Sequence, residues 1–278
     1  MTCRITVLCE NSVGALSGTL GEHGFSALIE PAGEEPLLFD TGQGATLLHN
    51  ADRMRKDLSR IKQVVLSHGH YDHAGGLLPL LQTYGAKEIF AHPDIFTPRY
   101  RVKDTGECFP IGVPQSLELL EQAGARFNFS AEYREVAPGI ALTGEVPRVT
   151  PFETGDQGLF CDCTGQELDA TPDDQSLILE TERGLVILLG CCHAGLVNTI
   201  EHIAYITGRR DIYAIIGGTH LGFCSQEQLE QTIAALKVLG ISKLVAAHCT
   251  GFAAAARLSR EFPRQFQVAT VGYTLEVL

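Results

Sequence analysis

Four potential metal ligands lie within six residues of one another, at His68, His70, Asp72 and His73. Imidazole and carboxylate groups suit zinc, iron and manganese. Gly69 between the first two histidines allows a turn that directs alternate side chains to different ions. Because burying this cluster without an ion would leave polar groups unpaired, the sequence predicts two divalent transition-metal ions. Zinc is the favoured metal, with iron or manganese as alternatives.

Three later histidines each follow a short apolar run that is typical of a buried strand. His193 follows residues 185–189, His220 follows 212–216 and His248 follows 243–247. Strand ends of an α/β sheet share one edge, where ligands gather. We therefore expect these histidines to lie near the first cluster.

Hydrophobic periodicity predicts the elements that must position these side chains. In the first half, strands are expected at 5–9, 26–30, 37–39 and 63–66, and helices at 45–60 and 76–84. In the second half, strands are expected at 176–180, 185–189, 212–216, 243–247 and 266–273, and helices at 194–207, 226–239 and 252–261. Residues 99–135 and 145–171 are rich in Gly, Pro and polar residues and predict elaborated loops. Alternation of strands and helices indicates an α/β fold.

Composition limits the classes of partner. A length of 278 residues is typical of one domain spanning 1–278. A net charge of −12 without a local basic patch argues against nucleic acid. No stretch is apolar enough to span a bilayer, so we expect no membrane association and a cytoplasmic location. The oligomeric state is not determined by the sequence.

The nine cysteines are an odd number and predict reduced thiols rather than a disulfide framework. Cys108 is interpreted as a packing residue, like Cys3 and Cys9. Cys191, Cys192, Cys224 and Cys249 lie near the predicted site histidines, but free cysteine is often a small buried hydrophobe, and packing is the favoured interpretation of each. Cys192 is kept as an alternative site residue.

The segment SHGHYDHAGGL resembles the HxHxDH signature of the metallo-β-lactamase superfamily, and LFDTG at residues 38–42 resembles its upstream aspartate motif. The resemblance spans most of the chain. It implies a four-layer αββα sandwich in which His68 and His70 hold the first metal, Asp72, His73 and His248 hold the second, and Asp40 supports the ligand loop from behind.

The chain departs from the familiar pattern of this superfamily at two places. It has no Gly-His-Thr-Pro-Gly segment, and Cys191-Cys192-His193 replaces the usual bridging aspartate. Three residues remain open as the ligand that completes the first site: His193 is favoured, then His220, then Asp174. His23 lies on a loop that either borders the site or forms a simple turn.

Further motifs, among them GEHG, GCCHAGLVNTI, IIGGTHL and AHCTG, resemble a branch that includes archaeal 7,8-dihydropterin-6-methyl-4-(β-D-ribofuranosyl)aminobenzene-5′-phosphate synthases and metal-dependent hydrolases. Asp72 and His220 are the predicted catalytic residues. The favoured activity is hydrolysis of a small phosphorylated or ester metabolite by metal-activated water. A pterin transferase that releases pyrophosphate is the alternative, and a non-catalytic metal sensor is a third possibility.

Overall fold

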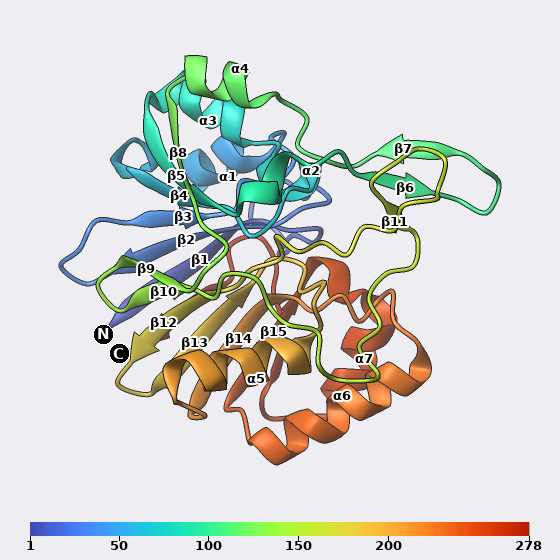
Figure 1. The fold of residues 1–278 in the computed structure, drawn as a ribbon. Coiled ribbons are helices and arrows are strands. Elements are labelled where there is room, and N and C mark those ends of the chain that lie inside the picture. Colours follow the sequence, from blue (N-terminus) through green and yellow to red (C-terminus); the bar gives the residue numbers. More distant parts are fainter. Residues whose placement is uncertain (278) are drawn as a thin grey trace.

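Two seven-stranded sheets pack face to face in the computed structural model, which describes residues 1–277 (Figure 1). The first sheet has, in spatial order, β17 (Thr274–Val277), β1 (Cys3–Cys9), β2 (Ser26–Pro31), β3 (Leu37–Phe39), β4 (Gln63–Val65), β5 (Lys87–Ala91) and β8 (Ala125–Phe129). The second has β16 (Phe266–Val268), β15 (Lys243–Ala247), β14 (Ile212–Gly218), β13 (Gly184–Leu189), β12 (Leu177–Thr181), β10 (Ile140–Leu142) and β9 (Arg134–Ala137).

Alternation along the strands produces three apolar layers, because successive side chains of a strand face opposite sides of its sheet. Phe39 and Val65 of the first sheet and Val186 and Ile216 of the second belong to the core between the sheets. Their neighbours face outward onto helices. Leu38 and Val64 share a cluster with residues of α1 (Leu47–Arg53), α3 (Leu77–Tyr84) and α4 (Leu117–Gln122).

The second sheet is covered in the same way. Ile187 and Ile215 pack with side chains of α5 (Leu196–Thr207), α6 (Gln226–Leu239) and α7 (Phe252–Glu261). The layers therefore run helix, sheet, sheet, helix, and the expected αββα sandwich is confirmed.

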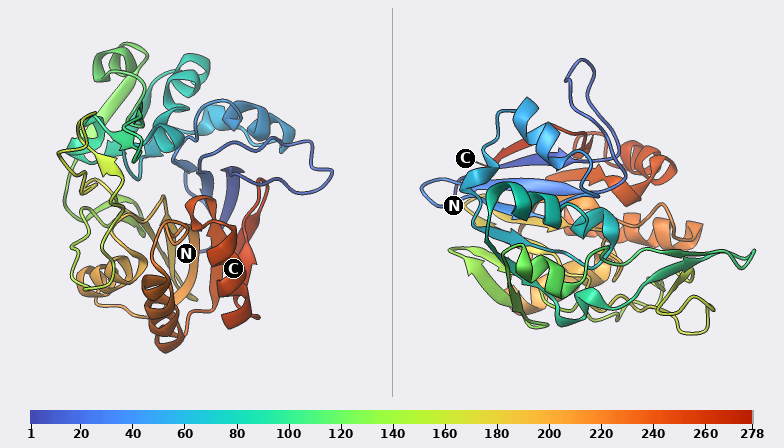
Figure 2. Two further views of the ribbon diagram at one scale, coloured as in Figure 1. Left: turned by 90° about the vertical axis from the view of Figure 1, so that its right-hand side faces the viewer. Right: turned by 90° about the horizontal axis from the view of Figure 1, so that it is seen from above.

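A three-stranded sheet projects from the sandwich and is called the arm below (Figures 1 and 2). It contains β6 (Tyr100–Val102), β7 (Cys108–Pro110) and β11 (Leu159–Phe160), with β6 in the centre. β11 pairs antiparallel with β6, so that Leu159 lies opposite Arg101. The arm thus joins the two segments that were predicted to be elaborated loops.

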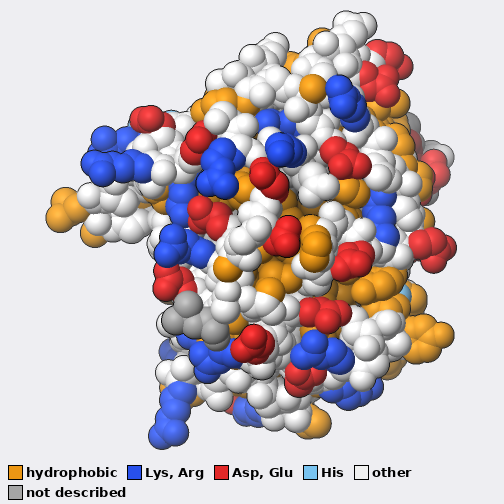
Figure 3. All heavy atoms as spheres, turned by 90° about the vertical axis from the view of Figure 1, so that its left-hand side faces the viewer, with side chains coloured by type: hydrophobic (Ala, Val, Ile, Leu, Met, Phe, Trp, Pro, Cys, Tyr) orange, Lys and Arg blue, Asp and Glu red, His pale blue; other side chains and the backbone are white. Residues whose placement is uncertain are grey.

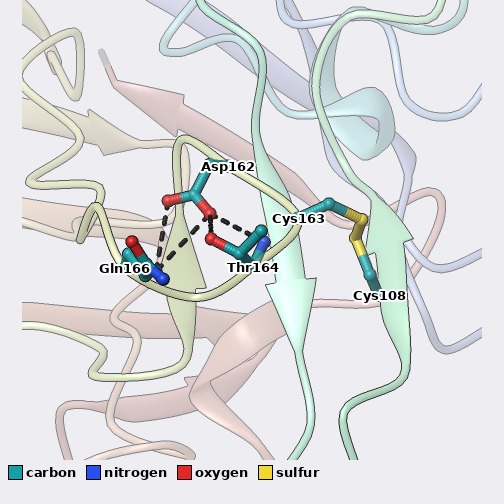
Figure 4. The surroundings of a disulfide bond; sticks show 5 residues. All are labelled: Cys108, Asp162, Cys163, Thr164 and Gln166. Atoms are coloured by element: carbon teal, nitrogen blue, oxygen red, sulfur yellow. Dashed lines mark hydrogen bonds between the residues drawn. A yellow bond between two sulfur atoms is a disulfide. The ribbon is translucent and has the colours of Figure 1, made fainter.

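Cys108 forms a disulfide bond with Cys163, which corrects its interpretation as a packing residue and the expectation that all cysteines are reduced (Figure 4). The bond connects β7 to the turn that follows β11. In that turn the Asp162 carboxylate accepts hydrogen bonds from the backbone N–H groups of Thr164 and Gln166. This pairing could not be predicted from the sequence, because the two cysteines lie in segments 55 residues apart that only the fold brings together.

Several predicted boundaries were also wrong. The helix expected at 45–60 ends at Arg53, because Arg55 adopts a left-handed conformation (φ 56°) and a separate 3₁₀ turn spans Leu58–Arg60. Residues 99–135 contain α4 and β8 besides the arm strands, so they are not only loop. The strand expected at 266–273 is only β16, which ends at Val268, and the next strand, β17, begins at Thr274 in the other sheet.

Acidic and basic side chains are interspersed on the face of the molecule shown in Figure 3. None of the helices within residues 1–277 has both the length and the apolar character needed to cross a bilayer.

Candidate metal centre

The predicted site histidines follow strand ends of both sheets and lie close together. The cluster from His68 to His73 follows β4 of the first sheet and includes the short helix α2 (Tyr71–Ala74). In the second sheet β13, β14 and β15 are parallel neighbours, so their carboxyl ends lie side by side. His193, His220 and His248 follow these ends, as the sequence predicted.

His68, His70 and His193 form a first donor set. The Nε2 atom of His68 lies 2.9 Å from the Nδ1 atom of His70, and donor atoms of all three residues lie within 4.8 Å of one another. All three side chains are buried. Among residues 1–277, neither ring nitrogen of His193 has a hydrogen-bond partner, nor does Nε2 of His70. Buried polar atoms normally have partners, so these orphaned nitrogens fit an ion held between them.

Asp72, His73 and His248 form a second donor set beside the first. The Nε2 atoms of His73 and His248 are 3.2 Å apart, and Oδ2 of Asp72 lies 3.2 Å from His248 Nε2 and 3.9 Å from His73 Nε2. All three residues are buried. One carboxylate and two imidazoles are a donor set that suits a divalent transition metal.

Cys191 lies where the two donor sets meet. Its buried Sγ atom is 3.2 Å from His73 Nε2 and belongs with His68 and His73 to one group of donor atoms within 4.8 Å. Cys191 stands at the position of the usual bridging aspartate, although a packing role was predicted for it. The structure instead places the thiol among the donor atoms. Its position after β13 was the signal that could have identified it.

Oxygen atoms outside the donor sets fix the orientation of the imidazoles. Asp40 Oδ2 lies 2.7 Å from His73 Nδ1, and Asn11 Oδ1 lies 2.9 Å from His248 Nδ1. Ser67 Oγ lies 2.8 Å from His68 Nδ1 and donates to Asp40 Oδ2 at 2.7 Å. In each case the Nδ1 atom is engaged, so the Nε2 atom faces the centre. Asn11 and Ser67 were missed from the sequence, because their roles depend on contacts that only the fold creates.

Burial and neighbouring charges give the two donor sets different electrostatics. Burial lowers the pKa of His70 to about 3 and that of His68 well below its ordinary value, so both imidazoles are neutral with a free lone pair. Burial acts in the same direction on His73, but Asp40 and Asp72 outweigh it and raise the pKa of His73 to about 9. Burial raises the pKa of Asp72, yet His73 and the hydrogen bonds from His23 and His248 hold it well below its ordinary value. Asp72 is therefore negative and His73 positive at neutral pH, whereas His68 and His70 of the first set are neutral.

His220 lies beside the first donor set and also faces a carboxylate. With Cys191 and His193 it belongs to a further group of donor atoms within 4.8 Å of one another. Its ring lies 4.3 Å from that of His193 between centroids, and its Nε2 atom is 3.5 Å from Asp156 Oδ2. Asp156 is in turn held by two contacts from Arg101 Nη1, at 2.8 and 2.9 Å. Phe223 stacks on His220 with centroids 4.9 Å apart. These residues connect the histidine cluster to the base of the arm.

A pocket of about 250 Å³ opens directly over both donor sets. Its lining includes His70, Asp72, His193 and His248 from the sets, with Tyr71, Ile111, Leu159 and Phe223 as apolar walls and Arg101 as a cation. A volume of this size suits a small molecule or one end of a longer one.

His23 lies on the rim of this pocket, which resolves the alternatives left open for it in favour of a position at the site. Its Nε2 atom is 3.1 Å from Asp72 Oδ2, and its ring centroid is 4.7 Å from that of His248. Its side chain is 48% exposed, in contrast to the buried donors. His23 is thus placed to contact a bound substrate and Asp72 together.

Two further candidates lie outside the donor sets. Asp174 Oδ2 accepts a hydrogen bond from the backbone N–H of Ala194 at 2.9 Å, so it supports the His193 loop from behind. Cys192 has a left-handed backbone (φ 63°) that turns its Sγ atom toward Thr199 Oγ1, at 3.4 Å, in the core under α5. Neither belongs to a group of donor atoms within residues 1–277. The Sγ atom of Cys192 faces the core, whereas the buried Oδ1 atom of Asp174 has no hydrogen-bond partner among these residues, so a ligand role for Asp174 stays a prediction.

The loops at this centre hold unusual backbone conformations. Asp40, His220 and His248 have φ values of 56°, 55° and 49°, in the left-handed region that non-glycine residues rarely occupy. Such conformations persist only where surrounding contacts enforce them, and they concentrate at functional sites. For His248 one such contact is its backbone N–H, which donates to Glu10 Oε1, a residue missed from the sequence.

Comparisons with known proteins agree with this geometry. A profile of the metallo-beta-lactamase superfamily matches residues 20–248. The chain is 33% identical to a 7,8-dihydropterin-6-methyl-4-(beta-D-ribofuranosyl)-aminobenzene-5′-phosphate synthase of Methanocaldococcus jannaschii, covering 97% of this chain and 95% of the relative. A crystal structure of a metal-dependent hydrolase of the beta-lactamase superfamily superposes with a TM-score of 0.84 at 31% identity, covering 99% of both chains. Zinc-bound PqqB from Methylobacterium extorquens shares the fold with a TM-score of 0.60 at 18% identity, covering 99% of this chain and 100% of the other.

Proposed function

The chain belongs to the metallo-β-lactamase superfamily, and from that premise we propose that it is a dinuclear metal-dependent hydrolase of a small phosphorylated or ester metabolite. The observation that carries the proposal is the pair of adjacent donor sets beneath one pocket. The first set would hold one divalent ion, and the second would hold another together with Cys191. Zinc suits the proposed set best, because thiolate and imidazole are both good zinc ligands.

Ions bound there would polarise a substrate oxygen and lower the pKa of water, which supplies a nucleophile at neutral pH. The chain itself performs the positioning. Asp40, Ser67 and Asn11 orient the imidazoles, and the apolar residues Ile111 and Leu159 limit access of bulk water to the pocket. Asp72 faces both His248 and His23, so its carboxylate is placed to fix the direction of a nucleophile.

His220 and Arg101 are proposed to bind the substrate. Both line the pocket and both contact Asp156, which fixes their relative positions. Their charges suit the phosphate or carboxyl oxygens of a small metabolite. The net charge of −12 and the small pocket favour such a substrate over a nucleic acid.

A second function is favoured by one specific observation, the 33% identity to a synthase over nearly the whole chain. In that reaction the bond between a pterinylmethyl carbon and a diphosphate oxygen breaks, the carbon bonds to an aminobenzene ribonucleotide, and pyrophosphate leaves. The same pair of ions would neutralise the diphosphate. The pocket walls Phe223 and Tyr71 offer aromatic faces for a flat ring.

One experiment distinguishes the two functions. Metal-loaded enzyme is incubated with phosphomonoesters, phosphodiesters and carboxylic esters, and separately with dihydropterin diphosphate and an aminobenzene ribonucleotide. Metal-dependent turnover in the first series that is lost in Asp72→Ala supports the hydrolase. Pyrophosphate release that requires both compounds of the second series supports the transferase. Turnover of β-lactams or RNA, with neither of these activities, contradicts both proposals.

A further inference from the structure

Residues Asp173, Asp174 and Gln175 form a continuous support, called the brace below, behind the first donor set. Asp173 Oδ2 accepts a hydrogen bond from the backbone N–H of Gly69 at 2.7 Å, between His68 and His70. The backbone N–H of Gln175 donates to the Ser67 carbonyl, and its side-chain amide to the Leu66 carbonyl, both at 3.0 Å. The brace therefore runs along the loop that carries two of the three donors.

The third donor is attached to the same brace. Asp174 Oδ2 accepts from the backbone N–H of Ala194, the residue after His193. Two loops that belong to different sheets are thus bound by neighbouring residues of one short segment. This segment thus contacts the loop of His68 and the loop of His193, which are far apart along the chain.

Arg99 fixes the brace through a buried ion pair. Its Nη1 and Nη2 atoms donate to Asp173 Oδ2 and Oδ1 at 2.8 and 2.7 Å, and its Nε atom donates to Asp169 Oδ2 at 2.9 Å. All three side chains are buried. A bidentate guanidinium–carboxylate pair fixes the plane of the carboxylate as well as its distance. Asp173 Oδ2 is therefore held in place for Gly69.

Close packing leaves the loop no alternative position. A Cβ atom added at Gly69 would lie 1.9 Å from the Ile95 carbonyl oxygen and 2.6 Å from Arg99 Nη1. The turn between His68 and His70 thus rests directly on the guanidinium group. Only glycine permits this approach.

We propose that Arg99 and Asp173 form a positioning pair that sets the geometry of the first metal site. The pair touches no donor atom and acts through Gly69 on His68 and His70, while Asp174 of the same brace holds His193. Arg99 also directly precedes β6, whose Arg101 lines the pocket, so the pair connects the arm to the metal loop. This inference rests on the metal centre proposed above.

The test compares two carboxylates that face the same guanidinium group. Asp173→Asn removes the charge that contacts Gly69. Asp169→Asn removes a similarly buried charge whose hydrogen bonds within residues 1–277 go to Arg99 and the backbone N–H of Thr171. Each variant is titrated with Co²⁺, whose visible absorption reports coordination geometry, and its thermal unfolding is measured. Asp173→Asn is expected to raise the Kd of one of two Co²⁺ ions by roughly tenfold or more and to change the spectrum. Asp169→Asn is expected to keep the wild-type spectrum and a Kd within about threefold of the wild-type value. This change is smaller than the loss of metal affinity that usually follows removal of a residue that orients a metal ligand.

If Asp173→Asn binds Co²⁺ with the affinity and the spectrum of the wild-type protein and differs only by a lower unfolding temperature, the positioning role is overturned. Equal changes in both variants would overturn it as well, since they would report a general effect of buried charge. If Asp173→Asn does not fold, Arg99→Lys carries the test, because lysine keeps the charge but loses the bidentate contact. A raised Kd in that variant supports the proposal, and an unchanged Kd contradicts it. Failure of the wild-type protein to bind Co²⁺ would instead contradict the metal centre itself.

Discussion

The Sγ atom of Cys191 lies 3.2 Å from the Nε2 atom of His73, at the boundary between the two donor sets. The next residue, Cys192, directs its thiol away from the centre toward Thr199. Cys191 is therefore a candidate metal ligand, and Cys192 serves as an internal control with the same side chain.

Cys191→Ala is expected to lower the affinity of the second metal by roughly ten- to a hundredfold and to abolish sulfur-to-cobalt charge-transfer absorption in the Co²⁺ protein. Cys191→Asp should restore much of the affinity without the charge-transfer band, because it supplies a carboxylate at the same point. Cys192→Ala should keep the band. Persistence of the band in Cys191→Ala would exclude Cys191 as its source and indicate Cys249, which belongs with Cys191 and His248 to one group of donor atoms.

Asp40→Ala is expected to weaken the second metal site although Asp40 is not among the donors. The substitution removes the acceptor of His73 Nδ1 and of the Ser67 backbone N–H, both at 2.7 Å. The metal Kd should rise by roughly tenfold or more. Loss of these buried acceptor contacts, together with that of Ser67 Oγ, should lower the free energy of unfolding by about 1–3 kcal/mol. Isothermal titration and urea unfolding measure the two effects, and a normal metal Kd would show that His73 needs no such support.

His193→Ala should reduce the bound metal from two equivalents to about one, because it removes a donor of the first set. His220→Ala should keep both equivalents and lose turnover, because we propose that this side chain, whose Nε2 atom lies 3.5 Å from Asp156 Oδ2, binds substrate rather than metal. Elemental analysis after gel filtration distinguishes the variants. Equal metal content in both would reject this division of roles.

Breaking the Cys108–Cys163 bond should destabilise the protein without emptying the metal centre. The bond closes a loop of 55 residues, so Cys108→Ser is expected to lower the free energy of unfolding by about 2–4 kcal/mol. Cys161→Ser, a change at the neighbouring free thiol, should alter it by no more than about 0.5 kcal/mol. Chemical denaturation under non-reducing conditions measures both. Similar stability of Cys108→Ser and wild type would mean that the arm unfolds separately from the sandwich.

The parts of this structure that the sequence predicted are those in which local signals agree. Ser225 caps α6 through the backbone N–H of Gln228, and the expected helix 226–239 has the observed bounds. The histidines after β13, β14 and β15 were predicted to converge because parallel strands end at one edge. The prediction of a helix at 45–60 was wrong in its C-terminal part, because Arg55 takes a left-handed conformation that its residue type does not indicate.

The unpredicted parts depend on contacts between distant segments. Arg99 meets Asp173 across 74 residues, and Glu10 meets the backbone N–H of His248 across 238 residues. Neither pair has a spacing or motif of its own. The sequence identified Asp174 as a possible ligand because the expected histidine motif falls there, whereas the fold uses that segment as a brace. Residue type and position alone could not distinguish these roles.

The first and last strands make this molecule a candidate for circular permutation. β1 and β17 pair antiparallel, with Cys3 opposite Val277, so both strands present their terminal ends on the same side (Figure 1). The other end of β1 leads to Glu10 and Asn11, which contact His248. A short glycine–serine linker could therefore join the chain ends far from the pocket, and new ends could be opened in the arm to vary access to it. Tags or surface attachment at either end should likewise leave the pocket unobstructed.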